Sequence, residues 1–148
     1  MNIISNFILI LVIVIFSSCS NKIIKESVIK EKSLDAQVLA AYDEGLVSLK
    51  TGDVLFAAKK FNEAEMLFPQ SEWAPKAALM AAYSYYSQDY LDDAIAELNR
   101  FLKLYPLNKN TDYAIYLLAY SHYEKIIDEK KDLQSILLAK ENFNILIK

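Results

Sequence analysis

Few side chains in this 148-residue sequence could carry out chemistry. One cysteine, Cys19, and one histidine, His122, are too few for a zinc site built from these residue types within the chain. Ser121 precedes His122, and because adjacent residues lie on different faces of a helix, we do not expect a nucleophile–base pair. We expect His122 on the surface or at the edge of a groove.

Acidic pairs, glycines and overall charge give no catalytic pattern either. We interpret two acidic pairs as solvated charges on helices: Asp92–Asp93 and Glu63/Glu65. Neither of the two glycines belongs to a G-x-G-x-x-G or P-loop pattern. The net charge of −3 and the lack of a basic cluster argue against nucleic acid as a partner. The sequence therefore predicts a binding protein with no catalytic residue, no metal and no dissociable cofactor.

Cys19 lies just after an apolar run. Residues 7–16 are apolar without a break, which corresponds to about 15 Å of helix, half of the hydrocarbon core of a membrane. This length fits the apolar part of a secretory signal peptide. The alternatives are a plain transmembrane anchor and a buried thiol.

The Ser-Ser-Cys stretch at 17–19 resembles the lipobox of bacterial lipoproteins, in which a peptidase cuts before the cysteine and the cysteine is acylated. We therefore predict a signal peptide over 1–18, a covalent lipid on Cys19, and a tether over 19–33. Ser20 is not the aspartate that resembles an inner-membrane retention signal. The expected location is the periplasmic face of the outer membrane.

Two stretches of the remaining chain, 41–69 and 77–106, are similar to each other. Each contains a helical pattern, a short turn, a second helical pattern with a central alanine, and an aromatic–proline stop. An offset of 37 residues joins three pairs: Pro69 and Pro106, Ala57 and Ala94, Phe68 and Tyr105. This spacing is typical of tetratricopeptide repeats, so we predict an all-α solenoid of antiparallel helix pairs.

The pattern predicts helix positions and their caps. Helices are expected near 36–50, 54–68, 72–87, 90–105, 112–127 and 135–148. The expected N-caps are Asp53, Asp89, Ser71 and Thr111. Small residues are expected where paired helices cross: Gly45, Ala82 and Ala119 in first helices, and Ala57 and Ala94 in second helices.

The repeat domain is expected over 34–148, with units at about 36–69, 71–106 and 111–148. In the third unit, the alanine of the second helix, Ala139, follows Ala94 by 45 residues, which indicates an insertion of about eight residues. The proline that should end this helix would fall near position 151. We therefore expect the sequence to be the N-terminal part of a longer protein.

Ten tyrosines are present, and four of them form one stripe of the helix expected over 112–127: Tyr113, Tyr116, Tyr120 and Tyr123. In tetratricopeptide arrays such first-helix positions face the concave surface. We predict a groove for an extended peptide lined by Tyr42, Leu46, Leu49, Tyr83, Tyr86, Tyr116, Tyr120 and Tyr123. The alternative is that these residues pack between repeats.

Residues 42–125 resemble the BamD (ComL) family of outer-membrane lipoproteins of the β-barrel assembly machinery. The resemblance rests on the aromatic-Pro-x-Ser-x-x-Ala stretch at 68–74, the Ala-Tyr-Ser-Tyr-Tyr run at 82–86, the Asp-Tyr-Ala-Ile-Tyr-Leu start at 112–117, and the inserted third repeat. Together with the lipobox, it covers nearly the whole chain.

The resemblance implies a non-catalytic scaffold with five repeats. Its implied partners are the barrel-forming outer-membrane assembly protein, bound largely through later repeats, other assembly lipoproteins, and unfolded outer-membrane protein segments at the N-terminal repeats. Outer-membrane lipid would be reached through the anchor. Two alternatives are a different periplasmic tetratricopeptide lipoprotein of cell-wall or envelope complexes, and an enzyme whose catalytic domain follows residue 148.

Overall fold

The computed structural model describes residues 33–126 and 132–147. Six α-helices and no strands occur in these two ranges: α2 (Leu34–Thr51), α3 (Val54–Leu67), α4 (Trp73–Tyr86), α5 (Leu91–Leu104), α6 (Thr111–Glu124) and α7 (Leu133–Leu146). The predicted all-α class is confirmed, and the predicted helix ends are correct to within three residues. Cys19, the predicted signal peptide and part of the predicted insertion lie outside the described residues.

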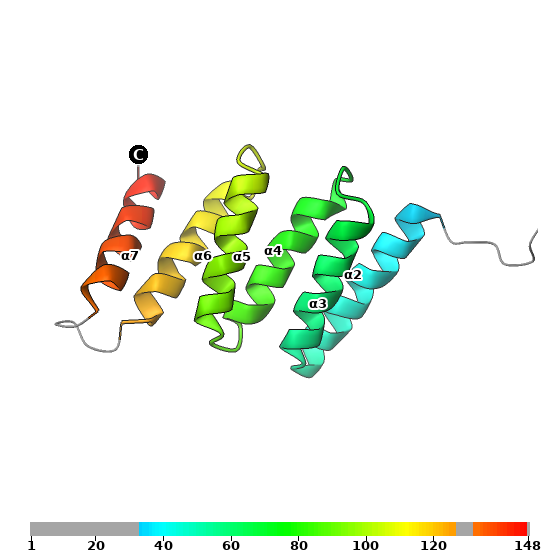
Figure 1. The fold of residues 1–148 in the computed structure, drawn as a ribbon, viewed down its shortest axis with the longest axis horizontal. Coiled ribbons are helices and arrows are strands. Elements are labelled where there is room, and N and C mark those ends of the chain that lie inside the picture. The colour runs from blue at the N-terminus through cyan, green and yellow to red at the C-terminus, as the bar shows by residue number, and fades with distance from the viewer. Residues whose placement is uncertain (1–32, 127–131, 148) are drawn as a thin grey trace, which may run out of the picture. The chain divides into compact units, whose positions relative to one another are not determined.

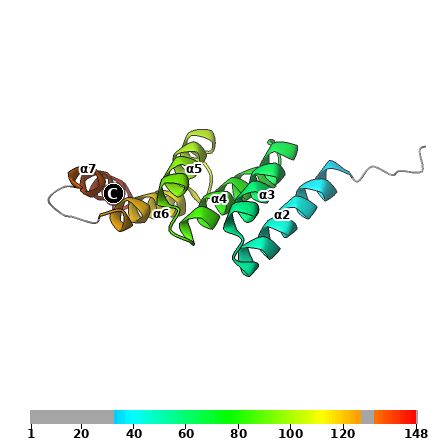
Figure 2. The ribbon, with the colours of Figure 1, turned by 60° about the horizontal axis from the view of Figure 1, so that its bottom comes forward.

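Consecutive helices pack against one another. Among the first helices of the pairs, α4 also contacts both α2 and α6. The arrangement is a row of antiparallel pairs, α2 with α3, α4 with α5, and α6 with α7, each pair followed by the next (Figures 1 and 2). This is the tetratricopeptide type of solenoid that the 37-residue offset predicts. In the part of the chain that the structure describes, no helix combines the length and the apolar character needed to span a membrane.

A left-handed residue ends the first helix of each of the first two pairs. Gly52, at φ 84°, ends α2, and its N–H donates to the Leu49 carbonyl oxygen while the Asp53 N–H donates to that of Ser48. This is the Schellman arrangement. The Asp53 carboxylate then caps α3 by accepting a hydrogen bond of 3.1 Å from the Phe56 N–H, as predicted.

The predicted cap at Asp89 is wrong by one position. By the offset of 37, Asp89 corresponds to Gly52 and not to Asp53. Like Gly52, it has a left-handed backbone conformation, with φ at 61°. The Asp89 N–H donates to the Tyr86 carbonyl oxygen and the Tyr90 N–H to that of Tyr85. Aspartate is one of the few residues with a side chain that tolerates this conformation.

The other two predicted caps have different outcomes. Ser71 does cap α4, because its hydroxyl oxygen accepts a hydrogen bond of 3.2 Å from the Ala74 N–H. Thr111 is not a cap: it is the first residue of α6, and its hydroxyl donates back to the Asn108 carbonyl oxygen at 2.7 Å. The preceding turn holds this side chain away from the helix.

Small residues stand where the helices of a pair cross, as predicted. A Cβ atom on Gly45 would lie 2.8 Å from the ring of Phe61, which is closer than atoms can pack. The four corresponding alanines are fully buried: Ala57, Ala82, Ala94 and Ala119. Phe61 and Leu98, each one turn after an alanine of a second helix, are also fully buried and form the centre of the packing between repeats.

A polar link joins the second helices of the first two repeats. Glu65 is 6% exposed, so its interpretation as a solvated charge is wrong. The Arg100 guanidinium donates to both of its carboxylate oxygens, at 2.7 and 2.9 Å, and the Tyr105 hydroxyl donates at 2.7 Å. Arg100 also donates to Asn62 and Glu97. These partners replace the water that Glu65 loses on burial.

Candidate peptide-binding groove

The first helices of all three repeats enclose a hollow of about 320 Å³. We call it the first-helix groove, and its lining residues are Tyr42, Lys76, Leu79, Met80, Tyr83, Asn110 and Tyr113. Tyr42 comes from α2, the next four residues from α4, Asn110 from the turn directly before α6, and Tyr113 from the start of α6. Packing of α4 between α2 and α6 therefore brings together residues from three repeats.

Two of the predicted groove residues, Tyr42 and Tyr83, line this hollow, and Tyr113 of the predicted tyrosine stripe joins them. Tyr83 is 36% exposed and Tyr113 45% exposed, whereas Tyr42 is half-buried. The Tyr42 ring makes edge contacts with Phe61 and Trp73, at centroid distances of 5.1 and 5.3 Å. Tyr42 is thus held by the core, and the other two rings are available to a ligand.

The tyrosine stripe of α6 forms a continuous ladder of rings. Centroid distances are 6.4 Å between Tyr113 and Tyr116, 5.8 Å between Tyr116 and Tyr120, and 5.8 Å between Tyr120 and Tyr123. Tyr86 of α4 lies beside the ladder, 6.3 Å from Tyr120. An extended chain that leaves the first-helix groove along α6 would meet aromatic rings throughout.

The predicted groove residues Leu46 and Leu49 have a different environment. Both are half-buried and pack against the cluster of Ala57, Ala58, Phe61 and Ala81. The two leucines therefore pack between repeats, which is the alternative that the sequence left open for these positions. Tyr42 packs against the same cluster and also lines the first-helix groove, whereas the two leucines do not line it.

Three tyrosines of the groove and the ladder, Tyr42, Tyr86 and Tyr113, have raised pKa values and are neutral at physiological pH. Burial, followed by the charge of Asp43, raises the pKa of Tyr42 above its ordinary value. Burial also raises the pKa of Tyr113, with smaller contributions from Tyr83 and Tyr116. Burial and the charge and hydrogen bond of Glu124 raise the pKa of Tyr86 to about 12. The hydroxyls of Tyr42 and Tyr113 can therefore donate to an oxygen of a bound segment, whereas that of Tyr86 donates to Glu124.

His122 is buried at 9% exposure, which corrects its expected surface position. Its helix carries the tyrosine ladder on one side, and His122 faces the packed side. Burial and then the charge of Lys125 lower its pKa, while Asp92, which is ion-paired to Lys125, acts in the opposite sense. A buried neutral imidazole of this kind contributes to packing.

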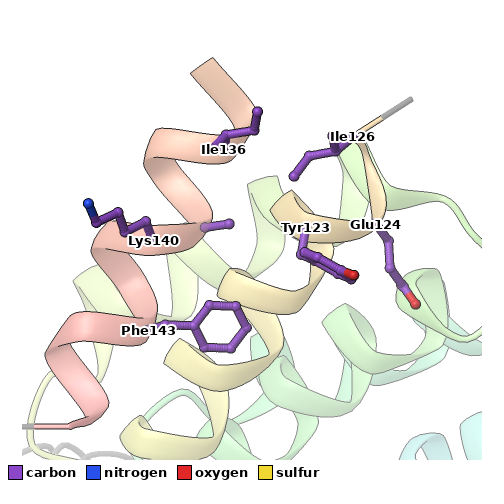
Figure 3. Close-up of a pocket in the computed structure, with 7 residues that line it drawn as sticks. Tyr123, Glu124, Ile126, Ile136, Lys140 and Phe143 are labelled. Carbon is purple, nitrogen blue, oxygen red and sulfur yellow. The ribbon is translucent and has the colours of Figure 1, made fainter. Parts of the chain in front are cut away.

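A larger hollow of about 1020 Å³ lies between α6 and α7. Figure 3 shows Phe143 of α7 directed toward α6, whereas the ammonium of Lys140 points away from it. By the repeat offsets, Phe143 corresponds to Leu98 and Phe61, and each of those packs against the first helix of the following repeat. The α6–α7 hollow thus has the character of a helix-packing surface, and the first-helix groove is the better candidate for a peptide.

Reasoning from sequence did not select four lining residues of the first-helix groove: Lys76, Leu79, Met80 and Asn110. Leu79 could have been found, because it lies 37 residues before Tyr116 and 37 after Tyr42. The other three were not predictable from the tyrosine pattern, since they reach the groove through the local geometry of α4 and the α5–α6 turn. Within 33–126 and 132–147, no group of three or more histidine, cysteine or acidic residues could hold a metal ion.

Known proteins are similar to this chain. An outer membrane protein assembly factor BamD of Caulobacter vibrioides is 32% identical over 83% of this chain and 39% of its own length. The BamD of Rickettsia prowazekii is 34% identical over 76% of this chain and 45% of its own length. The BamD of Neisseria meningitidis serogroup B is 37% identical over 56% of this chain and 31% of its own length. This chain therefore spans less than half the length of each of these relatives.

The YfiO family, described as an outer membrane lipoprotein, matches residues 34–148. This range contains all six helices and the whole first-helix groove. The resemblance to the BamD family drawn from the sequence is confirmed by these relatives. The chain belongs to the YfiO family of outer membrane lipoproteins.

Proposed function

We propose that this chain belongs to a non-catalytic scaffold lipoprotein of the outer-membrane β-barrel assembly machinery. In this proposal the repeats bind unfolded outer-membrane protein segments through the first-helix groove and the tyrosine ladder of α6. The scaffold also binds the barrel-forming assembly protein and other assembly lipoproteins. The family membership and the names of the relatives support the assembly role.

The single observation that carries the peptide-binding part is the convergence of three first helices on one aromatic hollow. Tyrosine rings supply a large apolar contact area with little loss of side-chain entropy, while their hydroxyls remain hydrated. An unfolded barrel strand alternates apolar and polar side chains. Such a segment can place its apolar side chains against the rings and its polar side chains toward water.

Site-specific photocrosslinking tests the groove. A photoreactive phenylalanine derivative at Tyr83, within the groove, is expected to crosslink to unfolded outer-membrane protein segments. The same group at Met66, an apolar residue of the second helix α3 that is 71% exposed against 36% for Tyr83, serves as a control that is more accessible than the groove position. Equal crosslinking at the two positions would contradict groove binding.

We further propose that Cys19 carries the lipid and that residues 19–33 form the tether to the outer membrane. Each buried methylene contributes about 0.8 kcal/mol of membrane binding, so two acyl signals give stable anchoring where one does not. The mass of the protein extracted from membranes tests this. A product that begins at Cys19 with added acyl mass is expected, and a retained residue 1 would reject it.

A further inference from the structure

The first helices of the second and third repeats are each covered on one face by the second helix that precedes them. On α4, Ala81 packs in one cluster with Ala57 and Phe61 of α3. On α6, Leu118 packs in one cluster with Leu98 of α5. The contact between repeats thus buries the same face of α4 and of α6.

The corresponding face of α2 is exposed. Three fully buried residues of α4 correspond, by the offset of 37, to residues of α2: Ala77 to Ala40, Ala81 to Glu44, and Ser84 to Val47. Val47 is 61% exposed, the Glu44 side chain is 55% exposed, and Ala40 is half-buried. Because α2 and α3 form the first pair of the described row, no described second helix precedes α2 (Figure 1).

A hollow of about 470 Å³ lies on this face. We call it the α2–α3 hollow, and its lining residues are Ala40, Asp43, Glu44, Val47, Ser48 and Phe56. Phe56 of α3 is 41% exposed and forms the apolar part of the hollow together with Val47 and Ala40. The hollow shares no lining residue with the first-helix groove, so the two surfaces are distinct.

The charges at the α2–α3 hollow are mainly negative. Lys60 of α3 lies 2.8 Å from the carboxylate of Glu44 and 2.9 Å from that of Glu63, so one ammonium serves two carboxylates. Asp43 is exposed and forms no ion pair with another described residue. The residue of α4 that corresponds to Glu44 is the uncharged Ala81. A helix that covers this face of α2 must therefore supply cations, because a carboxylate that is buried without a partner costs free energy.

We propose that the α2–α3 hollow is the docking surface for an amphipathic helix of a partner protein that carries lysine or arginine beside its apolar stripe. The apolar stripe contacts Val47 and Phe56, and the cations pair with Asp43 and Glu44. The partner helix packs on α2 as α3 packs on α4. A second copy of this chain does not fit, because a symmetric contact would bring two acidic surfaces together. This inference is independent of peptide binding in the first-helix groove.

Synthetic peptides test the charge and the helical pattern that the hollow requires. Full-length protein in detergent is titrated with a labelled peptide of 14 residues, the length of α3, built from leucine, alanine and lysine with one apolar helix face. A second peptide has glutamate in place of lysine. A third has the composition of the first in an order without an apolar face. Fluorescence anisotropy should show the first peptide binding about tenfold more tightly than the other two.

Substitutions locate the binding surface. Asp43→Lys should weaken binding of the lysine peptide about tenfold and strengthen binding of the glutamate peptide. Glu141→Lys, at an exposed position of α7, changes the net charge equally and should leave both affinities unchanged. Val47→Gln should weaken binding of the lysine peptide, whereas Met66→Gln, at an exposed apolar position of α3, should not. Circular dichroism shows whether each variant retains its helices.

Equal affinities for the lysine and glutamate peptides, or equal effects of Asp43→Lys and Glu141→Lys, would overturn the proposal. Photocrosslinking identifies the natural occupant. A photoreactive phenylalanine derivative at Val47, in cells that produce the full-length protein, should crosslink to a segment of another protein with apolar residues at helical spacing and adjacent lysine or arginine. A crosslink to a second copy, or to the N-terminal residues of the same chain, would overturn the assignment to a partner protein.

Discussion

The Arg100 guanidinium donates two hydrogen bonds, of 2.7 and 2.9 Å, to the carboxylate of Glu65, which lies 35 residues earlier in the sequence. The two residues lie on α5 and α3, the second helices of adjacent repeats. Arg100 is the only arginine of the chain. Because a guanidinium fits a carboxylate in a fixed orientation, this pair sets the register between the two repeats as well as contributing energy.

Removing one member of this pair should destabilise the protein. Glu65→Gln leaves the Tyr105 hydroxyl without a charged acceptor and leaves Arg100 with Glu97 as its charged partner, and we expect a loss of about 1–3 kcal/mol in the free energy of unfolding. The lower part of this range is expected because Arg100 is 36% exposed and can regain water. Urea denaturation followed by circular dichroism measures the change.

The same measurement on Glu72→Gln gives a control, since Glu72 is 80% exposed and loosely paired. A change under about 0.5 kcal/mol is expected there. The free energy of unfolding lost in the double variant Glu65→Gln/Arg100→Met should differ by about 1 kcal/mol from the sum of the losses in the two single variants. Additive effects would show that the two side chains act independently.

Gly45→Ala should destabilise the protein although alanine is the better helix former. The new methyl group would meet the Phe61 ring at 2.8 Å, and overpacking of this kind costs about 1–3 kcal/mol. Phe61→Leu in the same chain should recover part of the loss, because a smaller side chain makes room. If Gly45→Ala raises the melting temperature, the close crossing of α2 and α3 is incorrect.

Gly52→Ala tests a different property of glycine. Nothing lies within 4 Å of a Cβ at this position, but the φ of +84° is unfavourable for alanine, and a loss of about 1 kcal/mol is expected. Phe61→Leu should give no recovery here. Conversely, Asp89→Gly should leave stability unchanged or raise it by up to about 1 kcal/mol, because Asp89 occupies the equivalent left-handed position.

His122 should titrate below its ordinary pKa of 6.5. Because burial favours the neutral ring, the folded protein binds fewer protons than the unfolded chain, and the associated stability is lost as the pH falls below 6.5. The imidazole proton resonances give the pKa directly by NMR, since the chain has one histidine. Lys125→Met should raise this pKa and Asp92→Asn should lower it further; a wild-type value at or above 6.5 would contradict the buried position.

Tyr86 should lose its proton only near pH 12. Its folded pKa is raised from 10.0, so the stability linked to the neutral phenol is complete below pH 10 and is lost as the pH rises toward 12. Ultraviolet absorbance titration of the wild type and of Tyr86→Phe should differ by one phenolate that forms near pH 12. A difference that appears at pH 10 would show that Tyr86 is exposed.

The repeat architecture could be predicted from the amino-acid sequence, because a 37-residue offset in alanines, aromatic residues and prolines is explained by paired helices. The tyrosine stripe of α6 could also be predicted, since residues three and four apart share one face of any helix. Which polar groups are buried depends on the packing of helices that are distant in the sequence. Glu65 and His122 have the local sequence of exposed residues, and only the approach of another helix removed them from water. The same holds for the groove, where Lys76, Tyr42 and Tyr113 line one hollow because three repeats converge there. No local sequence pattern predicts that these three residues are close in space.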